Sequence, residues 1–211
     1  MTHDEDDRKR SHLRLVVDNV EMRNSRPAGS EEVFIPIDKL IAMRSEVRPD
    51  FYRGMERRYA KAYEAIERFI DLKGWPYGLD LQHGPLMVLP ADAVCPEAEG
   101  DRGEHRDEII LYVTEDTAGE GICLSMEMIL PFYSEEEAVM EDVLLFSPVF
   151  QYGTLFLEEN KQDQMLDLIY RFGFPAYPPA LTTRVLERLF TIIAFELKEV
   201  LRSLAEYSEG I

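Results

Sequence analysis

His105, Asp107 and Glu108 are the residues whose types and spacing come nearest to a metal site. If a strand begins here, the alternation of side chains places His105 and Asp107 on one face. Imidazole and carboxylate groups bind zinc, but the spacing matches neither the His-Glu-x-x-His motif nor an EF-hand loop. We therefore interpret the cluster as a charged junction between a loop and a strand, and keep its three residues as candidate metal ligands only.

A general base could lie at His83, which occupies a turn, residues 82–85, before an apolar segment. No serine or cysteine nucleophile is paired with His83 in the sequence, and a turn histidine bonded to backbone is the simpler interpretation. An enzyme is nevertheless the alternative hypothesis: a metal-assisted hydrolase built from His83, His105 and neighbouring carboxylates. That hypothesis requires these groups to converge in one pocket, which their spacing does not predict.

The two cysteines, Cys95 and Cys123, form no Cys-x-x-Cys motif and are too few for a disulfide framework. Glu120 and Glu127 lie near Cys123 and disfavour the thiolate that a catalytic cysteine needs. Glycine-rich phosphate-binding motifs are absent, so we expect no cofactor. Reduced thiols, an acidic N-terminus unlike a signal peptide, and apolar runs too short for a bilayer predict a cytoplasmic protein.

Acidic residues are concentrated in the middle of the chain. Residues 92–144 hold sixteen Asp and Glu residues against only Arg102 and Arg106, so this stretch accounts for −14 of the net charge of −18. Such a field repels nucleic acids and anionic membranes, and we expect neither as a partner. Basic or amphipathic protein segments would suit it better.

With 211 residues, 45% of them hydrophobic, the chain is long enough to bury a sizeable core. Residues 1–30 are charged, with a loop at 24–30, and are predicted to form a flexible arm. Residues 31–211 are predicted to form a single domain. An edge strand is expected at 33–37, where a proline interrupts a β-like apolar run.

Apolar residues at three- and four-residue spacing predict three helices, at 50–73, 161–172 and about 183–207. Asp50 is the expected N-cap of the first helix, and Gly74 its expected stop. Apolar or alternating segments predict strands at 86–89, 108–114, 122–130, 143–146 and 153–157, with a hairpin joining 108–114 to 122–130. The order favours an α+β fold in which the long N-side and C-terminal helices pack on one face of an antiparallel sheet of about four or five strands.

Aromatic residues near the ends of these elements are candidates for contact with a partner, because Tyr and Trp often line grooves that bind peptides. The candidates are Trp75, Tyr77, Phe132, Tyr133, Tyr152 and Phe174. The alternative is that these rings seal the edges of the core. A ligand pocket between helix 50–73 and the sheet is a further possibility.

The last predicted helix is apolar around more than half of its circumference, as expected for a central core helix or half of a dimer interface. In size, acidity and helix–sheet–helix order the chain is similar to small acidic secretion chaperones, although no diagnostic residues carry the resemblance. The sequence thus favours a non-catalytic, chaperone-like interaction module that forms a homodimer and binds a protein partner.

Overall fold

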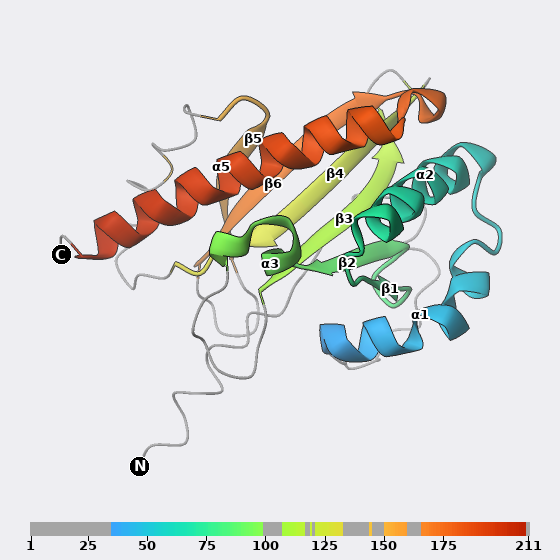
Figure 1. Ribbon diagram of the computed structural model, residues 1–211, viewed down its shortest axis with the longest axis horizontal. Coiled ribbons are helices and arrows are strands. Elements are labelled where there is room, and N and C mark those ends of the chain that lie inside the picture. The colour runs from blue at the N-terminus through green and yellow to red at the C-terminus, as the bar shows by residue number, and fades with distance from the viewer. Residues whose placement is uncertain are drawn as a thin grey trace, which may run out of the picture.

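The computed structural model describes residues 35–98, 107–116, 119, 121–132, 144, 150–159 and 166–209. Six strands form one antiparallel sheet in the order β1-β2-β3-β4-β6-β5 (Figure 1). The strands are β1 (Gly78–Asp80), β2 (Leu86–Pro90), β3 (Glu108–Glu115), β4 (Ile122–Ile129), β5 (Gly153–Glu159) and β6 (Leu166–Ala176). The α+β fold class is therefore confirmed. The predicted boundary at residue 30 stays a prediction, because residues 1–34 lie outside the described ranges.

Helices lie on both faces of this sheet, with the two longest on the same face. They are α1 (Ile37–Phe51), α2 (Arg57–Lys73), α3 (Ala91–Val94) and α5 (Thr183–Glu209), with 3₁₀ turns η3 (Pro96–Ala98) and η5 (Pro178–Ala180). Helices α2 and α5 pack on the same face of the sheet, as expected for the long helices (Figure 1). No helix in the described part of the chain combines the length and hydrophobicity needed to cross a bilayer.

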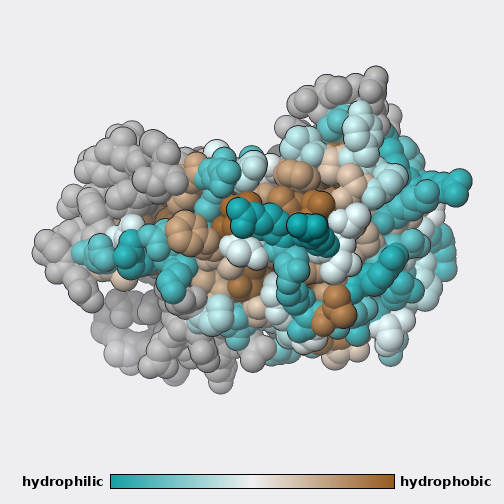
Figure 2. All heavy atoms as spheres, turned by 45° about the horizontal axis from the view of Figure 1, so that its top comes forward, coloured by the Kyte–Doolittle hydropathy of each residue, from teal (hydrophilic) through white to brown (hydrophobic). Residues whose placement is uncertain are grey.

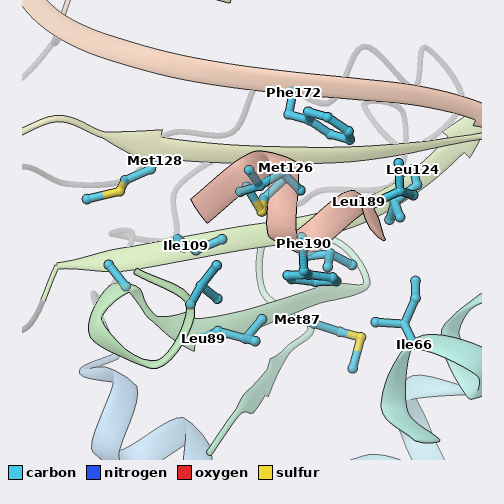
Figure 3. Close-up of a cluster of buried hydrophobic side chains, with 14 of the residues drawn as sticks. Ile66, Met87, Leu89, Ile109, Leu124, Met126, Met128, Phe172, Leu189 and Phe190 are labelled. Carbon is cyan, nitrogen blue, oxygen red and sulfur yellow. The ribbon is translucent and has the colours of Figure 1, made fainter. Parts of the chain in front are cut away.

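The main core lies between the sheet and helices α2 and α5. Alternate strand residues point into it, so each strand contributes one of its two faces (Figure 3). The labelled contributors are Met87 and Leu89 of β2, Ile109 of β3, Leu124, Met126 and Met128 of β4, Phe172 of β6, Ile66 of α2, and Leu189 and Phe190 of α5. This packing uses most of the broad apolar surface that the sequence predicts for the last helix.

Helix α1 packs on the other side of β1 and β2. Val88 points away from Met87 and Leu89 and contacts Ile37 and Leu40 in a separate apolar cluster. Opposite Val88 in the sheet lies Gly78, where an added Cβ would overlap Leu40. The glycine therefore permits the close approach of α1 to the sheet.

The predicted helix 50–73 is right for α2 and wrong at its start. Asp50 lies in the last turn of α1, and α2 begins at Arg57 after a turn in which Gly54 has a φ of 76°. The predicted end of the helix at Gly74 is confirmed. Gly74 adopts a φ of 68°, a left-handed conformation that is costly for residues with a side chain. The expected edge strand at 33–37 is wrong at Ile37, which begins α1. The Pro36 carbonyl accepts the first hydrogen bonds of this helix, from the N–H groups of Lys39 (3.0 Å) and Leu40 (3.2 Å).

The predicted helix 161–172 is wrong over its described part, since Leu166–Ala176 form β6. Residues 161–165 lie outside the described residues. Leu168, Tyr170 and Phe172 are buried on the core face, and this period of two prevails because β6 lies between β4 and β5. Gly173 and Pro175 lie within the strand, opposite Ser125 and Cys123. The expected strand at 143–146 lies outside the described residues apart from Leu144.

The remaining strand predictions are confirmed. Segments 86–89, 108–114, 122–130 and 153–157 correspond to β2, β3, β4 and β5, and β3 pairs with β4 as the predicted hairpin. The sequence misses β1, which has only three residues. The C-terminal helix is confirmed, and the Thr182 hydroxyl accepts a hydrogen bond from the Val185 N–H at its start (3.3 Å).

Candidate functional site

Of the three candidate metal ligands, Glu108 contacts the start of α1. The Glu108 carboxylate accepts a hydrogen bond from the backbone N–H of Ile37, the first residue of α1. Burial raises the pKa of Glu108 to about 7, with added repulsion from Asp38, Asp80 and Asp107. Among the described residues no group of three or more His, Cys, Asp or Glu side chains is placed to hold a metal ion. His105 lies outside the described residues.

His83 is held within the turn between β1 and β2. Its Nδ1 lies 2.7 Å from Oδ2 of Asp80, whose other oxygen accepts the backbone N–H of Gln82, also at 2.7 Å. Cys123 is half-buried in β4, and the Ser125 hydroxyl lies 3.6 Å from its sulfur. His83 thus contacts a carboxylate side chain within its own turn, where the sequence interpretation expects a bond to backbone, and a chemical role for His83 stays a prediction.

Buried carboxylates are the most unusual groups that the structure reveals, and sequence reasoning did not single them out. Glu67 of α2 accepts hydrogen bonds from Arg48 (2.9 Å), Tyr52 (2.7 Å) and Tyr77 (3.1 Å). Burial, followed by the interaction with Glu67, raises the pKa of Tyr52. These contacts join α1, α2 and the segment before β1, so Glu67 holds α1 against the body of the protein.

Glu127 of β4 is a second buried carboxylate, on the sheet face that points away from α2 and α5. Tyr112 of β3 donates a hydrogen bond to Glu127 (2.8 Å), and Arg171 of β6 pairs with the same carboxylate oxygen. The Arg171 guanidinium lies over the Phe156 ring of β5, 4.2 Å from its centroid. The cluster therefore links four adjacent strands, β3, β4, β6 and β5.

Glu196 of α5 is buried at the start of β5. Its two oxygens accept the backbone N–H groups of Gln151, Tyr152 and Gly153, at 2.7, 3.0 and 2.9 Å, and the hydroxyl of Tyr170 at 2.6 Å. An added Cβ at Gly153 would overlap the Tyr170 ring and the Glu196 carboxylate. Four donors thus compensate one buried charge, and they join α5 to β5 and β6.

The aromatic candidates differ in accessibility. Trp75 is half-buried and packs edge-on against Phe69 and Phe190, with centroids 5.8 and 5.4 Å away, and Tyr77 is only 2% exposed. Phe132 and Phe174 are partly buried against the main core, whereas Tyr152 is 42% exposed. Tyr133 lies outside the described residues. Of this set, Tyr152 is the described ring most open to a partner, and a binding role for the set stays a prediction.

Sequence reasoning missed Phe195, which is 64% exposed in the middle of α5. Residues that share its side of the helix recur at three- and four-residue spacing. We call the part of this set from Arg184 to Arg202 the α5 stripe: Arg184, Arg188, Thr191, Phe195, Lys198 and Arg202; the exposed Glu206 continues the same spacing one turn beyond it. A helical wheel reveals this signal, because it places one aromatic ring on the polar side of α5.

The surroundings of the α5 stripe are mixed in polarity. Figure 2, which views the molecule from the side of α5, shows hydrophobic surface in brown interrupted by hydrophilic residues in teal. Two acids flank the stripe and are paired: Glu187 with Lys73 of α2 at 2.8 Å, and Glu199 with Arg202 at 2.6 Å. The stripe therefore combines an exposed ring with guanidinium and ammonium groups, which is a composition suited to protein contact.

No protein-family model and no curated protein matches the chain. Among solved structures, the chain is similar to the crystal structure of YbjN from E. coli, with 12% sequence identity and a TM-score of 0.47. The match covers 67% of this chain and 90% of the YbjN chain.

Proposed function

We propose that this protein is a non-catalytic, chaperone-like interaction module, and that the α5 stripe is the surface with which it binds a segment of another protein. The observation that carries the proposal is the exposure of Phe195 on a helix whose opposite side is embedded in the core. A large aromatic ring left in water forgoes roughly 1.5–3 kcal/mol of burial. Contact with a partner would recover that stabilisation.

The rigidity of α5 supports the proposal. Its inward side packs on the sheet through residues such as Leu189, Ile193 and Leu197, and Glu196 ties it to the start of β5. A ring carried by such a helix loses little conformational entropy on binding, and aromatic residues with that property dominate the energetics of protein interfaces.

The other unusual groups have internal roles. The buried carboxylates Glu67, Glu127 and Glu196 each accept hydrogen bonds that join separate elements, and His83 is bonded within its turn. These contacts account for the burial of the charges without a reaction. They therefore support a binding role over the hydrolase alternative.

The acidic stretch at 92–144 is weaker support for a docking surface than the α5 stripe is. Among its described acids, Glu115 pairs with Arg58 of α2 at 2.9 Å, and Glu127 pairs with Arg171. Glu108 accepts the first N–H of α1. Because these charges serve the fold, we place the docking surface on α5.

A homodimer through α5 is the competing outcome of the test below. The cytoplasmic location stays a prediction.

Photo-crosslinking in the cells that make the protein tests the proposal. The photoreactive analogue p-benzoylphenylalanine replaces Phe195 in one variant and Leu72 in a matched control, because Leu72 is 71% exposed but lies on α2. We expect a discrete adduct with a different protein from position 195 and none from position 72. Adducts with a second copy of this chain alone would indicate a homodimer interface, and equal labelling at both positions would contradict a docking surface on α5.

A further inference from the structure

Given the proposed function, on which this inference rests, we infer that the partner segment is acidic and inserts an apolar side chain beside Phe195. The basic residues of the α5 stripe carry this inference, because they surround the exposed ring on a protein whose net charge is −18. Complementary charge selects partners and speeds their encounter.

The charge balance of helices α2 and α5 differs from that of the whole chain. Helices α2 and α5 together contain nine Lys and Arg residues and eight Asp and Glu residues, so they are close to neutral. Two of these acids, Glu67 and Glu196, are buried. Two more, Glu187 and Glu199, are paired with Lys73 and Arg202. Between Arg184 and Arg202 the outward surface of α5 carries four basic residues against Glu187 and Glu199, so it has a net positive charge, and one of its cations, Arg202, is already paired with Glu199.

The position of Arg184 is not explained by the stability of the helix. It lies in the first turn of α5, where the helix dipole favours an acidic residue, and no acidic residue occupies that turn. Phe195 contradicts a second local preference, because it leaves an apolar ring on the solvent side. Such departures from local preference are expected where a surface serves binding.

A second copy of the chain would meet mixed charges at the α5 stripe. If two α5 helices paired in an antiparallel arrangement around Phe195, Arg188 of one copy would meet Arg202 of the other, seven residues from the ring on either side, and Arg184 would meet Glu206, eleven residues from it. One of these pairings is repulsive and the other attractive, whereas an acidic segment would be attracted by every basic residue of the stripe. Nucleic acid would also meet cations at the stripe, but the net charge of −18 opposes its approach.

The spacing of the stripe defines the partner segment. Arg188 and Arg202 lie about 10 Å from Phe195 along the helix, one on each side. A helical segment would match this spacing if it carried an apolar residue in its centre and carboxylates about two turns before and after it. One carboxylate would reach Arg188, the other would share Arg202 with Glu199, and the central side chain would cover the ring.

Fluorescence anisotropy with the full chain tests this inference. The probe is a labelled helical peptide in which glutamates flank a Leu-Trp pair. We expect it to bind, and we expect a variant with Arg188→Glu and Arg202→Glu to bind about tenfold more weakly, with a smaller dependence on salt. The matched control carries Lys39→Glu and Arg53→Glu, which change the net charge equally on exposed positions away from α5, and it should bind as the unchanged protein does.

Further probes give the outcomes that would overturn the inference. A peptide with lysine in place of glutamate should not bind, and equal binding of both peptides would contradict an acidic partner. A single-stranded DNA oligonucleotide that binds more tightly than the glutamate peptide, regardless of Phe195→Ala, would indicate a general polyanion site. Light scattering that shows a dimer disrupted by Arg188→Glu would assign the surface to a second copy.

The two proposals fail in different ways. If photo-crosslinking at position 195 gives an adduct with another protein, but the glutamate peptide binds the Arg188→Glu, Arg202→Glu variant unchanged, the docking surface stands and the acidic partner does not. If no adduct forms and no peptide binds, the interaction function itself is contradicted.

Discussion

Phe195 and Glu196 are neighbours in the chain and lie on opposite sides of α5. Phe195 is 64% exposed, and its neighbour Glu196 is 3% exposed. Each lies on the side of the helix that its chemistry disfavours, but Glu196 has four hydrogen-bond donors around it. Of the described residues, none stacks on the Phe195 ring. The burial of the carboxylate is thus explained inside the molecule, whereas the exposed ring is the feature that we propose a partner covers.

The largest expected effect is on the inward side of α5. Glu196→Leu leaves three backbone N–H groups and the Tyr170 hydroxyl without their acceptor. We expect the free energy of unfolding to fall by about 3–5 kcal/mol, because one partner of a buried, hydrogen-bonded charge is removed. Urea titration with the slope held common measures this loss.

The matched control for Glu196→Leu is Glu199→Leu on the same helix. Glu199 pairs with Arg202 at 2.6 Å near the surface, where an ion pair contributes about 0–1 kcal/mol. A loss below roughly 1 kcal/mol for Glu196→Leu would remove the difference between the two sides of α5 and show that the carboxylate is dispensable for the fold.

Glu108 is a partly buried carboxylate whose charge, unlike that of Glu196, is stabilised by few hydrogen-bond donors. It accepts the Ile37 N–H, but Asp38, Asp80 and Asp107 repel its charge. Its pKa is raised from 4.5 to about 7, so the folded state binds the proton more tightly than the unfolded state does. The resulting stability is fully present below about pH 4.5 and is lost as the pH rises through about 7.

We therefore expect Glu108→Gln to stabilise the protein at pH 8 relative to pH 5, by up to about 3 kcal/mol in the difference between the two pH values. The neutral amide removes the repulsion while keeping an oxygen that can accept the Ile37 N–H. Urea titrations of both proteins across this pH range measure the effect. Parallel pH profiles for the two proteins would show that Glu108 does not titrate in this interval.

Local patterns in the sequence predict much of the fold. The strict alternation across 122–130 gives β4, Gly74 marks the end of α2, and the long apolar repeat after Thr182 gives α5. In each case the decisive physical signal lies within a few residues, because side-chain periodicity and backbone conformation are local properties. Such signals need no knowledge of the partner element.

The failures have a different cause. The apolar spacing of 166–172 fits both a helix and a strand, and only the neighbouring strands β4 and β5 decide for β6. Glu196 meets donors 26 to 45 residues away in the chain, so its compensation is invisible in the sequence. The exposure of Phe195 is the missed feature that local reasoning could have found, because a helical wheel places it among Arg184, Arg188 and Arg202.

The smallest expected effect is on the outward side of α5. Because Phe195 is largely exposed, we expect Phe195→Ala to change the free energy of unfolding by no more than about 0.5 kcal/mol, whereas Leu189→Ala, at a buried position of the same helix, should cost about 2–5 kcal/mol. Urea titration compares the two variants. A loss above roughly 1.5 kcal/mol for Phe195→Ala would assign the ring to the packing of the fold. A small loss would show that the ring contributes little to the fold, so that a weaker complex of this variant could be attributed to the missing contact.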